Sequence, residues 1–116
     1  MDDYRVILTP DAEADLADIK QYISVNLQAP ETAIRYLTVL KKDTGKLAFY
    51  PEKYQIMEEE PWKSRGLRFL KSKGFQIYYR IDEQAHTVYV LNYIYTRRDQ
   101  LRALSQKNDF DFTKEE

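Results

Sequence analysis

Positive charge is concentrated in the second half of this chain. Residues 61–107 carry ten Lys or Arg and three Asp or Glu, whereas residues 1–60 carry seven basic and twelve acidic residues. No acidic residue lies between Trp62 and Ile81. Each cation that meets a phosphate adds affinity by releasing counterions, so this segregation is typical of a nucleic-acid-binding face. The alternative is a solvated sheet surface with no ligand.

Such a face could cleave RNA without a metal ion. Attack by the 2′-hydroxyl requires a base, an acid for the leaving oxygen and fixed positive charge at the phosphorus. Arginine suits only the last role because it stays protonated, so a lysine or tyrosine with a lowered pKa would have to move the protons. The candidate catalytic residues are Arg68, Lys71, Lys73, Tyr95 and Arg97, and the candidate nucleic-acid-binding residues are Arg65, Tyr78, Arg80 and Arg98.

Not every tyrosine can belong to a site, because ten are present. We assign Tyr4, Tyr22, Tyr36 and Tyr50 to packing, and Tyr95 suits a core position as well as a site position.

Other chemistries find little support in the residue types. His86 is the single histidine and falls in a predicted turn, and three glycines cannot build a Gly-rich phosphate loop. No nucleophile elbow is present. The three glutamates at 58–60 are typical of solvated loop charge, and the chain has no cysteine. We therefore expect no metal and no cofactor.

Hydrophobic spacing predicts the elements that must position these residues. A short strand over residues 4–8 ends at Thr9 and Pro10, which are typical of a helix start. Apolar residues at steps of three and four then predict helices over residues 10–27 and 30–49. Because the connection between them is so short, we expect an antiparallel helical hairpin.

After a connector at residues 51–64 the period changes to two. This predicts an antiparallel meander of strands at residues 67–71, 75–82 and 87–95. Arg68 should point outward from the strand that buries Leu67 and Phe69. Adjacent strands lie about 4.8 Å apart, so cations from neighbouring strands should converge on one exposed face. A short closing helix with Leu101 and Leu104 completes a β-α-α-β-β-β-α order.

We thus expect an α+β fold in one domain, residues 1–106, with a flexible acidic tail at 107–116. Residues 1–25 lack a basic-then-apolar leader, and no apolar run approaches the roughly 20 residues that span a bilayer. The absence of cysteine suits a reducing compartment. These features predict a cytoplasmic protein that does not contact membranes.

The ordered combination of these segments resembles the RelE/ParE toxin superfamily. Residues 9–23 are similar to its first helix, and residues 67–69, 74–83 and 88–99 are similar to its sheet and C-terminal signature. The resemblance covers about residues 4–104. It implies the toxin of a type II toxin–antitoxin operon, neutralised by a cognate antitoxin protein that wraps it, with oligomers possible through the antitoxin.

The superfamily divides by target. RelE-like members cut mRNA on the ribosome, ParE-like members inhibit DNA gyrase without nuclease activity, and a member that has lost toxicity would remain an antitoxin-binding scaffold. Arg68 and Arg97 match RelE-type basic positions, whereas Gln76 replaces a RelE arginine and Ala103 lies near the place of its closing tyrosine. The resemblance implies a ribosome-dependent mRNA endoribonuclease, with gyrase inhibition as the alternative.

Overall fold

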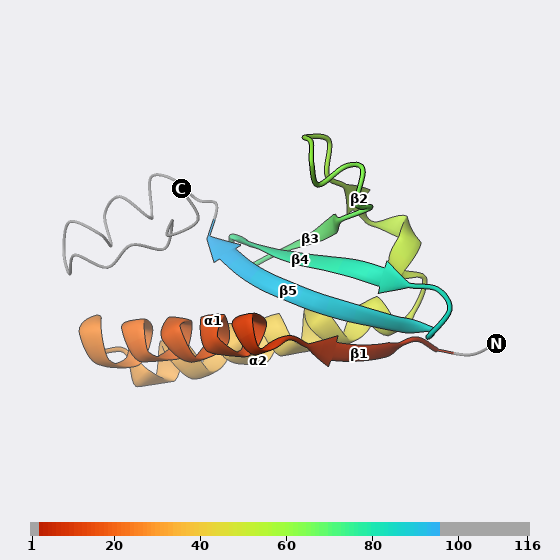
Figure 1. The fold of residues 1–116 in the computed structure, drawn as a ribbon. Coiled ribbons are helices and arrows are strands. Elements are labelled where there is room, and N and C mark those ends of the chain that lie inside the picture. The colour runs from red at the N-terminus through yellow and green to blue at the C-terminus, as the bar shows by residue number, and fades with distance from the viewer. Residues whose placement is uncertain (1–2, 96–116) are drawn as a thin grey trace.

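Two helices lie against one face of a five-stranded sheet in the computed structural model, which describes residues 3–95 (Figure 1). This arrangement confirms the expected α+β fold. The predicted closing helix and acidic tail fall outside the described residues. The elements in chain order are β1 (Arg5–Leu8), α1 (Pro10–Gln21), a π-helical turn (Tyr22–Asn26), α2 (Pro30–Gly45), two 3-10 turns (Lys46–Ala48 and Pro51–Lys53), β2 (Gln55–Ile56), β3 (Arg68–Ser72), β4 (Phe75–Asp82) and β5 (Thr87–Tyr95).

The helical hairpin forms as the sequence predicts. The Thr9 hydroxyl caps α1 by accepting the Ala12 N–H at 3.2 Å, and it also donates to the Val90 carbonyl at 2.9 Å. Proline at the first helical position costs no hydrogen bond there. The start of α1 is therefore fixed to β5 as well as to its own backbone.

The sheet order is β1-β5-β4-β3-β2. The predicted antiparallel meander is confirmed as β3-β4-β5. Two features extend it beyond the prediction: β1 joins β5 as a parallel edge strand, and the two-residue strand β2 pairs with β3 within the expected connector. Both of these strands lie at an edge of the sheet.

Strand β5 contains a bulge at Leu91. Tyr79 pairs with Val90 while Tyr78 pairs with Asn92, so Leu91 is an extra residue in β5. One Asp15 carboxylate oxygen, on α1, accepts hydrogen bonds from the Tyr93 backbone N–H at 3.0 Å and the Asn92 side-chain amide at 3.1 Å. The helix thereby satisfies polar groups on the strand just beyond the bulge.

The core lies between the helices and the sheet. Its polar groups are paired, as burial requires: the Tyr93 and Thr44 hydroxyls are 2.8 Å apart, and the Tyr79 hydroxyl donates to the Pro51 carbonyl at 2.6 Å. We call the face of the sheet that carries Tyr79 and Tyr93 and packs against the helices the covered face, and the opposite face of the sheet the open face. The most buried side chains of the core include Ala12, Tyr22, Ala33, Leu40, Leu47, Phe75, Ile77, Val88 and Val90.

No helix within residues 3–95 is long and apolar enough to cross a lipid bilayer.

Candidate functional site

Arg68 lies on the covered face, so the outward orientation predicted for it is wrong. It pairs with Tyr79, whose side chain is buried, whereas Phe69 pairs with Tyr78 on the open face. The Arg68 Nη1 donates to the backbone carbonyls of Glu52 at 2.9 Å and Tyr54 at 2.8 Å. Its guanidinium therefore holds the turn that precedes β2.

The other cations of the sheet lie in three different places. The Lys73 Nζ is 4.9 Å from the ring centroid of Tyr36 on α2, so this side chain reaches toward the helices. The Arg80 guanidinium carbon is 4.5 Å from the ring centroid of Tyr89, in the half of β4 remote from the β3–β4 turn. Lys71 pairs with Gln76 and is exposed on the open face. Lys71 and Arg80 share the open face but lie at different points along β4, and Arg68 and Lys73 do not join them, so within residues 3–95 the predicted convergence of cations on one site does not occur.

The two predicted site tyrosines of the sheet have different surroundings. Tyr95 is 4% exposed, with its ring centroid 4.7 Å from that of Phe75, so it is a core residue. Tyr78 is on the open face, where its hydroxyl donates to the Gln76 side chain. Arg65 is exposed in the loop between β2 and β3. Arg97 and Arg98 lie outside the described residues.

Three tyrosines have surroundings that raise their pKa values, which works against a role as proton acceptor. Burial raises the pKa of Tyr79, and it also raises the pKa of Tyr93 despite the hydrogen bond to Thr44. Hydrogen bonds to Glu83 and Glu52 raise the pKa of Tyr4. A general base for RNA cleavage requires a shift in the opposite direction.

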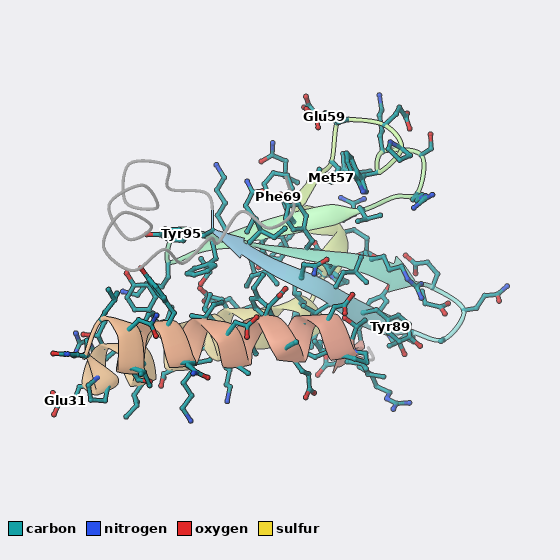
Figure 2. All side chains as sticks on the ribbon, turned by 60° about the vertical axis from the view of Figure 1, so that its left-hand side comes forward. Glu31, Met57, Glu59, Phe69, Tyr89 and Tyr95 are labelled. Carbon is teal, nitrogen blue, oxygen red and sulfur yellow. The ribbon has the colours of Figure 1, made fainter. Side chains whose placement is uncertain are left out.

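A hollow of about 320 Å³ lies between the open face and the loop that joins β2 to β3. Figure 2 shows Met57 and Glu59 on this loop above Phe69, with Glu59 at its outer end. The Phe69 and Tyr78 ring centroids are 5.9 Å apart beneath it. The hollow is mostly apolar and aromatic, and its lining residues are Met57, Glu59, Trp62, Leu67, Tyr78, Asn92 and Ile94.

A second feature that the sequence interpretation missed lies at the end of the sheet where β5 begins. The Tyr4 hydroxyl oxygen is 2.9 Å from one carboxylate oxygen each of Glu52 and Glu83, and the Tyr4 ring stacks on His86 at 3.9 Å. Beside them Tyr50, which we had assigned to packing, is 75% exposed. The Tyr50–Pro51 pair is the sequence signal for this exposed position, because a residue followed by proline marks a turn.

No group of three or more His, Asp or Glu side chains among residues 3–95 is placed to hold a metal ion.

Comparisons with known proteins place this geometry in a family. Residues 6–100 match the model of the ParE toxin of the type II toxin-antitoxin system, parDE. The structure described as the chromosomal ParDE TA system from P. aeruginosa is similar with a TM-score of 0.67 and 21% identity, covering 81% of this chain and 97% of that chain. No curated protein matches the chain.

A second similar structure is the toxin-antitoxin complex RelBE2 from Mycobacterium tuberculosis. Its TM-score is 0.56 at 21% identity, and the match covers 82% of this chain and 93% of that chain. At this identity both structures show a shared fold. Since the family model spans most of the chain, this protein belongs to the ParE family and is a toxin of a type II toxin-antitoxin system.

Proposed function

We propose that this toxin arrests growth by binding and inhibiting DNA gyrase, and that a cognate antitoxin neutralises it. The observation that carries this proposal is the position of Arg68. The resemblance to RNA-cleaving relatives gives this arginine a phosphate-binding role, but its guanidinium is bound to two backbone carbonyls next to β2. Membership in the ParE family supports the same choice.

The spacing of the remaining cations supports a non-catalytic role. Lys71 lies opposite Gln76, and Arg80 is four residues further along β4. At about 3.3 Å per residue, the two backbone positions are about 13 Å apart along the strand. A single scissile phosphate requires charge and proton-transfer groups within hydrogen-bond reach of each other.

The open face also has the composition of a protein contact. Aromatic residues and methionine are enriched at protein interfaces, and here Trp62, Tyr78 and Met57 surround a shallow hollow. A target side chain could enter this hollow without any chemical step. The proposal therefore describes an inhibitor that acts by occupancy.

The experiment compares the two targets directly. Purified toxin added to gyrase should reduce DNA supercoiling and accumulate cleaved DNA complexes, while mRNA in a translation extract should stay intact. The matched control is the toxin saturated with its antitoxin, which should leave gyrase active. Codon-positioned mRNA cuts together with unaffected gyrase would overturn the proposal.

A ribosome-dependent mRNA endoribonuclease is the second candidate. It is favoured by Lys71 lying on the same face as the Phe69 and Tyr78 rings, on which unpaired bases could stack. In this case the cuts should vanish in Lys71→Ala and in Arg97→Ala. If neither gyrase nor mRNA is affected but the antitoxin still binds, the chain is an antitoxin-binding scaffold.

A further inference from the structure

Two neighbouring aromatic side chains project into solvent from one turn. Phe49 is 54% exposed and Tyr50 is 75% exposed, and both follow the helical segment that ends at Ala48. We call residues 48–54 the aromatic turn. Single exposed apolar side chains are common, but two adjacent large ones on one turn are a feature of interaction sites.

The backbone of the aromatic turn is fixed from three sides. The Tyr4 N–H donates to the Ala48 carbonyl at 2.9 Å, the Tyr79 hydroxyl donates to the Pro51 carbonyl, and Arg68 binds the carbonyls of Glu52 and Tyr54. These donors come from the residue that precedes β1, from β4 and from β3. The turn is thus held by the sheet, so a partner that binds its exposed rings need not order the backbone that carries them.

Tyr50 occupies a conformation that does not favour tyrosine. Its φ is 51° and its ψ is 58°, in the left-handed region, and the next residue is proline, which disfavours helical angles in the residue before it. Glycine or asparagine would satisfy this backbone at lower cost. Because the Tyr50 ring is largely exposed, its burial within the chain does little to offset this backbone cost.

The surface beside the aromatic turn is acidic. The Tyr4 hydroxyl has one hydrogen but contacts carboxylates of both Glu52 and Glu83, so at least one of these contacts lacks a hydrogen from Tyr4. Glu52 is part of the turn, and the shared Tyr4 hydroxyl holds the Glu83 carboxylate beside it. A complementary partner would present an Arg or Lys side chain there.

We infer that Phe49 and Tyr50 anchor the toxin to a folded protein target whose apolar pocket is flanked by an Arg or Lys side chain. The inference deepens the proposed function and rests on the target being a protein. A pair of rings on a fixed turn suits a preformed pocket, whereas a disordered antitoxin segment gains more from wrapping an extended surface.

This anchor is separate from the hollow on the open face. Glu83 and His86 precede β5, whereas Ile94 of the hollow lies near its other end. Figure 2 shows Tyr89 and Tyr95 toward opposite ends of this strand, which at about 3.3 Å per residue is about 26 Å long. On the side of the β2–β3 loop the two surfaces come closer, because Met57 of the hollow is three residues beyond the aromatic turn, so one partner could engage both.

The test is the double variant Phe49→Ser/Tyr50→Gly. Glycine adopts positive φ readily, so the melting temperature should be unchanged or higher than that of the wild type. Growth arrest after induction without antitoxin, and inhibition of purified gyrase, should both weaken at least tenfold. Antitoxin affinity should stay within twofold. Ile34→Ser, which removes a 62% exposed side chain on α2, is the matched control and should change neither activity more than twofold.

The outcomes separate this inference from the proposed function. If wild-type toxin arrests growth but leaves gyrase active, the gyrase proposal fails, and the inference is then judged by growth arrest alone. The inference is overturned if the double variant arrests growth like the wild type. It is also overturned if the variant loses antitoxin binding, or if it breaks a wild-type dimer, because the turn would then contact the antitoxin or a second copy.

Discussion

The two faces of the sheet use their polar side chains for different purposes. On the covered face each polar group described above has a partner within the chain, as Tyr93 has with Thr44 and Arg68 with two carbonyls. On the open face Lys71 and Arg80 are exposed, and rings line a hollow. A cation in a strand of this sheet therefore stabilises the fold when it lies on the covered face and is available to a target when it lies on the open face.

The largest difference in the free energy of unfolding should separate alanine variants of two isoleucines on opposite faces of the sheet. Ile77→Ala should lower the free energy of unfolding by about 3 kcal/mol, because Ile77 is fully buried under the helices and its loss leaves a cavity. Ile94→Ala, on the rim of the hollow, should lower it by less than about 1 kcal/mol. Urea unfolding measures both. Equal losses in the free energy of unfolding would show that the two faces contribute equally to stability.

A smaller effect should separate two cations of β3. Arg68→Ala leaves the Glu52 and Tyr54 carbonyls without their donor and should cost about 2 kcal/mol of stability. Lys71→Ala should cost less than about 0.5 kcal/mol, since its side chain is exposed. Thermal unfolding of the two variants checks this. A Lys71→Ala loss as large as that of Arg68→Ala would show that the open face also holds the fold together.

The smallest expected effect is a pH dependence at the edge where α2 meets β3. Burial acts to raise the pKa of Asp43, but the hydrogen bonds from Ser72 and Lys46 outweigh it and hold this pKa below its ordinary value. A lowered pKa in the folded state means that the stabilisation is present above the unfolded pKa, near 4, and is lost as the pH falls below it.

Stability measured from pH 6 down to pH 3 should therefore decline less steeply in Asp43→Asn than in the wild type. If stability declined equally with pH in Asp43→Asn and in the wild type, the contacts of the Asp43 carboxylate would not stabilise the packing of helix against sheet.

Local sequence patterns were sufficient for the helices and the meander but not for the phase of β3. In β3 the apolar residues Phe69 and Leu70 are adjacent, so alternation alone allows either of them to be the residue that faces the core. Leu70 is the one on the covered face, because it pairs with the buried Ile77. Because this pairing forms between strands, no local pattern reveals it. The outward orientation predicted for Arg68 followed from that choice.

Long-range contacts account for the remaining differences. The parallel pairing of β1 with β5 joins residues about 80 positions apart, and β2 is too short for a recognisable period. The left-handed Tyr50 also depends on tertiary bonds, because Tyr4, which precedes β1, and side chains of β3 and β4 each donate to its turn. The aromatic turn could therefore be marked as a turn from the sequence but not as an exposed pair of rings.

The extra residue in β5 determines which way the last part of the strand faces. Val88 and Val90 are buried before it, and Tyr93 and Tyr95 after it, so even-numbered positions give way to odd-numbered ones. Deleting Leu91 would remove the bulge and leave Tyr93 and Tyr95 buried, whereas a regular strand that kept Leu91 would turn them outward and bring Asn92 and Ile94 against the helices. The bulge therefore absorbs one position of the chain, so that the side chains before and after it face the same core.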